Sequence, residues 1–210
     1  MQRDTDQGMK KINHNSKIIL LRHGEVDIQN YKKIPASQFG KWVNAYNSSN
    51  IKSEFKSKNE IKILFNEADA LICSNLKRSI QSVEIFNKIP FEINELFNEA
   101  ELPYLNLNLL KLNPKVWLII FRILWFFGYS KNCESFKMTK QRAKIATKNL
   151  IKFSKQNKTL ILVGHGIMNK LIQKELILLN WNETKSMTNN NWSYGVFELN
   201  ENKDTNKRVF

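Results

Sequence analysis

The chain has 210 residues, 42% of them hydrophobic and 25% charged, which is typical of a globular protein with one domain. Its formal net charge is +14, from 33 basic and 19 acidic residues. The lysines are scattered and no nucleic-acid-binding motif is present, so we expect no nucleic-acid partner. The positive charge instead favours phosphorylated, anionic substrates by long-range attraction.

The two cysteines, Cys73 and Cys133, form no CxxC pair and have no metal-ligand spacing. We therefore expect free thiols, a cytoplasmic location and no bound metal or cofactor. The first 16 residues are polar and lack the apolar core of a secretory signal, so they are predicted to be a disordered leader. Residues 17–200 are predicted to form a single domain, and 201–210 a polar tail.

Apolar runs too short for helices alternate with longer helical patterns along the chain. Helices are expected at 39–48, 60–67, 76–88 (with Ser74 as its N-cap), 136–155 and 167–179, and strands at 18–21, 70–73, 90–93, 160–163 and 192–199. Such alternation predicts a three-layer α/β/α sandwich with a mainly parallel central sheet.

Two of the three histidines follow buried strands and are flanked by glycine. His23 lies in Arg22-His23-Gly24 after the first strand, and His165 lies in Gly164-His165-Gly166 after the fourth. Arg78 lies in the first turn of the helix that follows the second strand. Open α/β sheets bind ligands at the carboxyl ends of their strands, and helix N-termini attract anions. Since arginine binds phosphate through two parallel hydrogen bonds, we expect a phosphate site here.

These motifs resemble the histidine phosphatase superfamily, the phosphoglycerate mutase-like proteins. The resemblance rests on Leu21-Arg22-His23-Gly24-Glu25, on Ser74-Asn75-Leu76-Lys77-Arg78-Ser79-Ile80-Gln81-Ser82 and on Val163-Gly164-His165-Gly166, which occur in the family's order. It implies a phosphoglycerate mutase-like fold with a small helical cap inserted at about 97–134. It also implies a metal-independent phosphomonoesterase of the histidine acid phosphatase type, acting on a phosphorylated small molecule.

The resemblance further implies a role for each matching residue. His23 would be the nucleophile and form a phosphohistidine, and a protonated His165 would add positive charge. Glu99 would be the general acid, with Glu101 as the alternative. Arg22 and Arg78 would hold the phosphate oxygens, while Gly24, Gln29, Asn30 and Gly166 would contribute to substrate binding. Val26 and Asn75 depart from residues common in the family, which leaves details of the pocket open.

Three other functions compete with phosphomonoester hydrolysis. Phosphoglycerate mutase-type phosphoryl transfer needs further basic groups in the cap, and this cap is chiefly hydrophobic. A protein phosphohistidine phosphatase would have little cap, whereas residues 105–132 form an insertion. A non-catalytic phosphate-binding or interaction module is disfavoured because both His23 and His165 are present.

The segment 116–127 is apolar except for Arg122. As a helix its 12 residues would span about 18 Å, too short for a membrane, which needs about 20 apolar residues. We expect it to be buried on most sides. It could wall a substrate pocket, form a homodimer interface, or touch a membrane surface with Lys115 and Lys131 at its margins. A role in the cap or at an interface is favoured over peripheral membrane contact.

Overall fold

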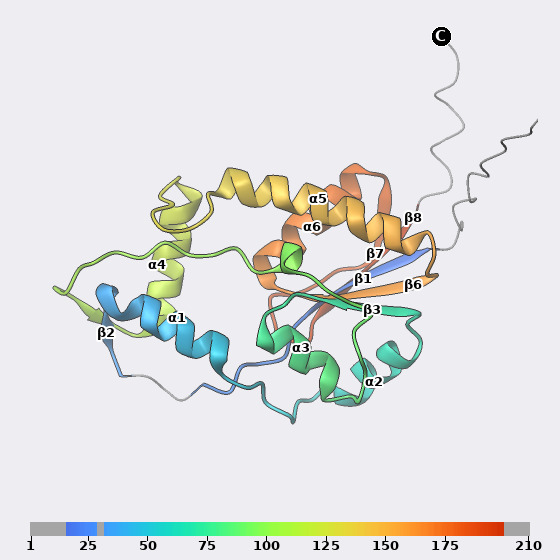
Figure 1. Cartoon of the computed structure of the whole chain (residues 1–210), viewed down its shortest axis with the longest axis horizontal. Helices are drawn as coiled ribbons and strands as arrows, with labels where there is room; N and C mark the ends of the chain where they lie inside the picture. The colour runs from blue at the N-terminus through green and yellow to red at the C-terminus, as the bar shows by residue number, and fades with distance from the viewer. Residues whose placement is uncertain (1–15, 29–31, 200–210) are drawn as a thin grey trace, which may run out of the picture.

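The centre of the molecule is a six-stranded sheet with the order β4-β3-β6-β1-β8-β7 (Figure 1). The computed structural model describes residues 16–28 and 32–199. The strands are β1 (Lys17–Arg22), β3 (Ala70–Cys73), β4 (Glu92–Ile93), β6 (Thr159–Gly164), β7 (Trp181–Lys185) and β8 (Tyr194–Leu199). β8 runs antiparallel to β1 and β7, and the pairs β1–β6, β3–β6 and β3–β4 are parallel.

The register of the parallel strands brings three strand ends together at one edge of the sheet. Arg22 of β1 lies opposite Gly164 of β6, and Cys73 of β3 lies opposite Val163 of β6. The residues that directly follow these strands, His23, Ser74 and His165, therefore emerge next to one another.

Helices cover both faces of the sheet because successive side chains of its buried strands point to opposite faces. Ile18 and Leu20 of β1 pack with residues of α5 (Phe136–Ser154) and α6 (Gly166–Leu178). Ile19 and Leu21 pack with residues of α2 (Lys58–Asn66) and α3 (Lys77–Glu84). Figure 1 shows these two helix layers on either side of the sheet, so the predicted three-layer sandwich is confirmed.

A separate apolar cluster forms a cap beside one end of the sandwich (Figure 1). It joins α1 (Phe39–Ser48) to α4 (Pro114–Phe126) and includes side chains from a ribbon of β2 (Ile34–Pro35) and β5 (Lys111–Leu112). Short 3-10 helices, η1 (Ala36–Gln38) and η2 (Glu95–Phe97), lie before α1 and before the loop that leads to this ribbon. In the cluster Trp117 stacks on Phe121 with ring centroids 5.3 Å apart, and Phe121 lies 4.8 Å from Phe39.

Several sequence expectations are wrong in detail. The helix expected over 76–88 ends at Glu84, and its N-cap is Leu76 rather than Ser74. β7 was not expected, because only Trp181 of its five residues is buried and an edge strand of this kind has no apolar run. Ser16 belongs to the expected leader but is buried. The remaining leader and the 201–210 tail lie outside the described residues.

α4 is exposed along one whole side, although burial on most sides was expected. Trp117, Phe121 and Trp125 recur every four residues and are buried. Its opposite face is exposed, at Val116, Ile119, Ile123 and Phe126. Within residues 16–28 and 32–199, no helix has both the length and the apolar character needed to cross a membrane.

Candidate active site

His23 is presented at the end of β1 with one defined ring orientation. The side chain is buried, and its Nδ1 lies 2.7 Å from the carbonyl oxygen of Gly24. Because a carbonyl only accepts, Nδ1 carries the proton and Nε2 keeps its lone pair. Asn191 donates from Nδ2 to the carbonyls of His23 (2.8 Å) and Gly24 (3.3 Å), which holds this turn from the far side. The arrangement leaves Nε2 as the nucleophilic atom.

His165 lies directly beside His23, with ring centroids 5.0 Å apart. Its Nε2 is 2.7 Å from the hydroxyl of Ser74 and 3.2 Å from that of Ser79. A hydroxyl that donates to Nε2 places the ring proton on Nδ1. Nδ1 is buried and has no hydrogen-bond partner in the described part of the chain. His165 therefore offers one unused donor.

The two predicted arginines reach the same place from different elements. Arg78 of α3 is buried, donates from Nη1 to Asn47 Oδ1 at 2.7 Å and lies over the ring of Tyr46. Arg22 of β1 donates from Nη1 to the carbonyl of Asn189. The Nε atoms of both arginines are buried without a hydrogen-bond partner among the described residues. Together with His165 Nδ1, the site holds three unsatisfied buried donors, an arrangement suited to an anion.

Glu99 joins the site through the first turn of α6. Its carboxylate accepts from the backbone N–H groups of Ile167 (3.1 Å), Met168 (3.1 Å) and its own neighbour Ala100 (3.0 Å). A Cβ built on Gly166 would lie 3.7 Å from both Glu99 Oε2 and Arg22 Cζ, so both side chains lie close to that glycine. The backbone N–H groups of Ile167 and Met168 at the start of α6 are therefore already hydrogen-bonded to Glu99.

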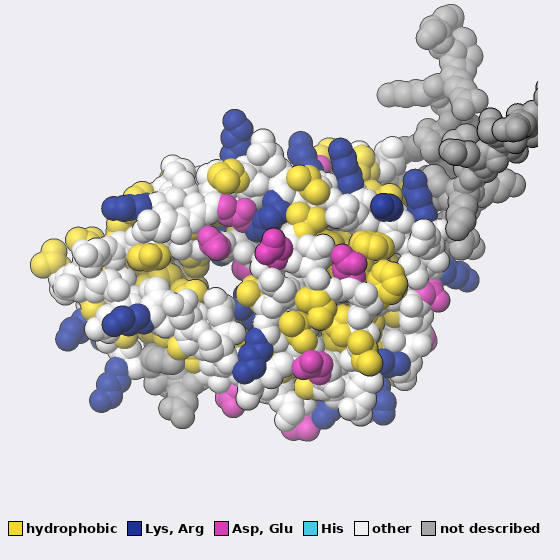
Figure 2. Space-filling view, viewed as in Figure 1, with side chains coloured by type: hydrophobic (Ala, Val, Ile, Leu, Met, Phe, Trp, Pro, Cys, Tyr) yellow, Lys and Arg dark blue, Asp and Glu magenta, His cyan; other side chains and the backbone are white. Residues whose placement is uncertain are grey.

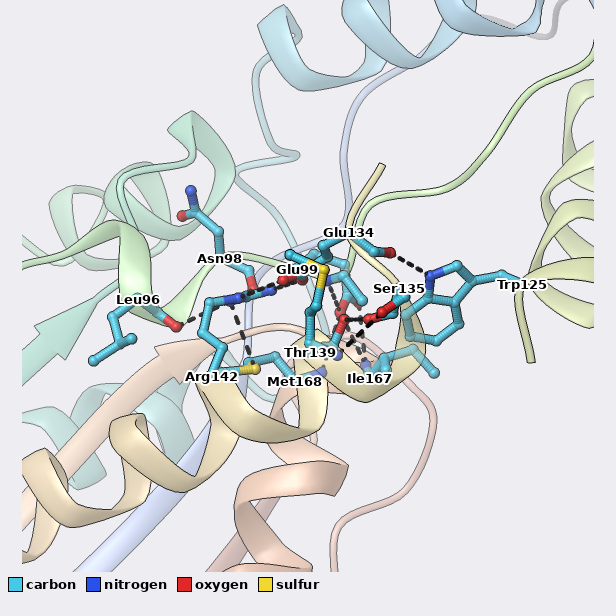
Figure 3. Close-up of polar contacts among 12 residues, drawn as sticks. Leu96, Asn98, Glu99, Trp125, Glu134, Ser135, Thr139, Arg142, Ile167 and Met168 are labelled. Carbon is cyan, nitrogen blue, oxygen red and sulfur yellow. Dashed lines mark hydrogen bonds and ion pairs between the residues drawn. The ribbon is translucent and has the colours of Figure 1, made fainter. Parts of the chain in front are cut away.

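The segment that carries Glu99 is fixed by Arg142 of α5 (Figure 3). Arg142 Nη1 donates to the carbonyls of Leu96 (3.0 Å) and Asn98 (2.8 Å), and its guanidinium forms an ion pair with Glu134. These groups line an open depression of about 440 Å³, whose rim also includes Glu101. Glu101 is exposed there, whereas Glu99 reaches inward to α6.

Gly24 is required by close packing. A Cβ at this position would lie 2.5 Å from Trp192 Cζ2, far inside van der Waals contact. Its N–H donates to the Ser82 hydroxyl at 2.8 Å. Gly24 thus shapes the turn after His23, and its N–H is already used within the protein. Of the other predicted binding residues, Gly166 lies at the site, and Gln29 and Asn30 lie outside the described residues.

Burial and neighbouring arginines keep both histidines neutral. Burial, followed by the positive charge of Arg78, lowers the pKa of His23 well below its ordinary value. The pKa of His165 is lowered well below its ordinary value for the same two reasons, in the same order. The expectation of a protonated His165 is therefore wrong for the protein without bound anion. Neutral His165 still donates through Nδ1, and neutral His23 keeps a nucleophilic Nε2.

Sequence reasoning missed the polar residues that hold these groups in place. Asn191 and the Asn189 carbonyl precede β8, which pairs antiparallel with β1 and so begins beside the end of β1. The cluster of asparagines before the last strand was a usable signal once that strand's direction was known. The roles of Asn47 and Arg142 could not be predicted from the sequence, because each forms its hydrogen bond with a residue far away in the chain.

Potential metal ligands are dispersed: within residues 16–28 and 32–199, no three His, Cys, Asp or Glu side chains gather closely enough to hold a metal ion. Cys73 and Cys133 are free thiols, as expected. Burial raises the pKa of the Cys73 thiol to about 12, which is consistent with a role in core packing.

Comparison with known proteins agrees with this geometry. Among solved structures, the product of open reading frame Rv3214 from Mycobacterium tuberculosis is similar, with a TM-score of 0.60 and 14% identity, covering 90% of this chain and 93% of that one. An α-ribazole phosphatase from Shigella flexneri has a TM-score of 0.54 and 13% identity, covering 88% and 91%. At such identities these structures show the fold alone. No curated protein matches the sequence significantly.

The sequence profile described as "Histidine phosphatase superfamily (branch 1)" matches residues 62–210, which is more than half of the chain. The matched region includes Arg78 and His165 and begins after His23. Such a relationship supports phosphatase or phosphoryl-transfer chemistry in general. With the mostly parallel sheet and the paired histidines at its edge, it shows that the chain belongs to the histidine phosphatase superfamily.

Proposed function

We propose that the chain hydrolyses phosphomonoesters of small molecules through a phosphohistidine on His23, without a metal ion. The observation that carries the proposal is the set of three unsatisfied buried donors, Arg22 Nε, Arg78 Nε and His165 Nδ1, beside the free Nε2 of His23. Preorganised donors that face developing charge contribute most of the rate in phosphoryl transfer, and removing one commonly costs about 10²-fold or more.

In the first step His23 Nε2 attacks phosphorus, and the bond between phosphorus and the leaving oxygen breaks. The leaving alcohol takes a proton from a general acid. The His23 ring then carries a positive charge, which the Gly24 carbonyl at Nδ1 stabilises. The dianionic phosphate also favours proton uptake by His165, since a bound negative charge offsets the effect of the arginines on its pKa.

In the second step water attacks phosphorus, and the P–N bond to His23 breaks. The proton of this water passes to the carboxylate that acted as acid, and inorganic phosphate leaves. The enzyme thereby returns to its starting state without any further reactant.

Glu99 is the proposed acid because its carboxylate reaches the site beside Arg22, while Glu101 is exposed on the rim of the depression. In the unliganded protein this carboxylate accepts hydrogen bonds from the start of α6. To act as the acid, Glu99 must therefore turn one carboxyl oxygen away from α6 and toward the leaving group when substrate binds.

The proposal is tested by hydrolysis of p-nitrophenyl phosphate in the presence of EDTA. Wild type should be active, His23→Ala inactive, and Arg78→Ala slower by about 10²-fold. Lys77→Ala is the matched control, because Lys77 precedes Arg78 on α3 and its side chain is exposed. Activity that EDTA abolishes, or that survives in His23→Ala, would contradict the proposal. Transfer of phosphate between positions of a sugar acid, with no release to water, would instead indicate a mutase.

The assignment of the acid is tested by comparing leaving groups. Glu99→Gln should slow an alkyl phosphate far more than p-nitrophenyl phosphate, because nitrophenolate leaves without a proton. Glu101→Gln should affect neither substrate appreciably. If Glu99→Gln slows both substrates equally and also lowers the melting temperature, Glu99 serves only to cap α6.

A further inference from the structure

We propose that the outer end of the cap is a docking surface for an anionic lipid bilayer. This cap surface consists of the exposed face of α4, the loop 107–110 and the basic residues that border them. None of the residues of the cap surface takes part in the proposed phosphoryl-transfer chemistry.

The apolar part of the cap surface is unusually exposed. Val116, Ile119, Ile123 and Phe126 follow one another at helical spacing along the outer face of α4. The opposite face of the helix is held by the cap core, and on this face Phe126 contacts Phe136 of α5. The four side chains nevertheless stay between 41% and 62% exposed. Leu109 near the start of α4 is 95% exposed and Phe127 at its end is 87% exposed. Protruding leucine and phenylalanine side chains are typical of helices that lie in a membrane interface.

The charge of the cap has a single sign. Residues 28–53 and 102–133, which include the elements of the cap, contain eight basic residues and no acidic residue. Lys111 and Lys115 flank the start of α4 and are exposed, as is Lys131 after its end. On the face drawn in Figure 2, the end of the molecule that carries the cap has yellow and dark blue side chains but no magenta ones. The acidic side chains of that face lie over the sandwich and the depression.

This combination fits a bilayer better than a second copy of the chain. A symmetric dimer through this face would bring the same lysines from two protomers together, with no cap carboxylate to pair with them. An anionic lipid surface offers diffuse negative charge for scattered lysines and an apolar layer for protruding side chains. The span of α4, 13 residues or about 20 Å, suits a helix that lies along such a surface rather than crossing it.

The test is co-sedimentation of the full chain with two kinds of vesicle, phosphatidylcholine alone and phosphatidylcholine mixed with phosphatidylserine. We expect binding only to the mixed vesicles, and loss of that binding at high salt. Absence of binding to the mixed vesicles at low salt, or equal binding to both kinds, would overturn the proposal.

Variants locate the contact on the cap. Lys111→Glu with Lys115→Glu should weaken vesicle binding by about tenfold or more, and Leu109→Ser with Phe127→Ser should do the same. The matched control is Ile89→Ser, an equally exposed apolar residue before β4 and outside the cap, which should bind as wild type does. All variants should keep the wild-type melting temperature. Undiminished binding by both cap variants, or a solution dimer that the cap variants dissociate, would overturn the proposal.

Discussion

Replacing Gly24 by alanine tests whether the turn after the nucleophile is fixed by close packing. The added Cβ would lie 2.5 Å from Trp192 Cζ2 and 2.9 Å from Cε2. Ordinary carbon contacts are about 3.5–4.0 Å, so the indole or the His23 turn must shift by about 1 Å. The indole cannot shift freely, because it is buried and stacks on Phe55 at 4.0 Å. We expect a loss of about 1–3 kcal/mol in the free energy of unfolding, or about 2–12 °C in melting temperature.

Activity should fall by about 10²-fold, since a displacement of about 1 Å at a reacting atom commonly has that effect. Both losses are measured by thermal unfolding and by p-nitrophenyl phosphate hydrolysis. Trp192→Phe in the same chain should restore part of each, with a coupling of about 1 kcal/mol or more. Gly40→Ala is the control, because its Cβ would lie 3.9 Å from Tyr104, an ordinary contact. Wild-type stability and activity in Gly24→Ala would refute the packing argument.

Three further outcomes are expected. The pKa values of His23 and His165 are lowered in the folded protein, so the unfolded chain binds more protons on these two side chains. The free energy of unfolding should therefore fall as pH drops below about 6.5, by up to about 1.4 kcal/mol per pH unit for each histidine. Urea unfolding from pH 7 to 5 measures this change, and a free energy of unfolding that does not vary with pH would contradict it. Ser74→Ala should lower kcat by about tenfold and Ser79→Ala by less, because the hydroxyl of Ser74 is closer to His165 Nε2; equal effects would show that the tautomer is not fixed by Ser74. Inorganic phosphate at about 100 times its Kd should add about 2.7 kcal/mol to the free energy of unfolding of wild type. An equal gain in Arg78→Ala at the same phosphate concentration would show that Arg78 does not bind the phosphate.

The buried strands and long helices were predictable because their residues follow regular apolar patterns. β3 (Ala70–Cys73) and α1 (Phe39–Ser48) have the bounds expected from sequence. The convergence of His23 and His165 was also predictable, since both follow parallel strands of one sheet. The apolar pattern does not predict the direction and register of β8 relative to β1. These two properties place Asn191, which precedes β8, beside the turn that follows β1.

Hydrogen bonds of side chains to distant backbone were not predictable from single residues. Nothing in the sequence indicates that Glu99 caps α6 or that Arg142 holds the segment before it. The exposed face of α4 was missed for a different reason. A helix that is apolar almost all round is normally buried on most sides, and here only the side that carries Trp117 and Phe121 is covered.

The most direct measurement is a rapid-quench search for the phosphorylated enzyme during turnover, followed by peptide mapping. The proposed mechanism predicts one acid-labile, base-stable phosphoryl group on the peptide that contains His23. This group should be absent from His23→Ala and should still form in Glu99→Gln with p-nitrophenyl phosphate. A phosphoryl group on any other residue, or turnover by wild type without a phosphorylated enzyme at any quench time, would contradict it.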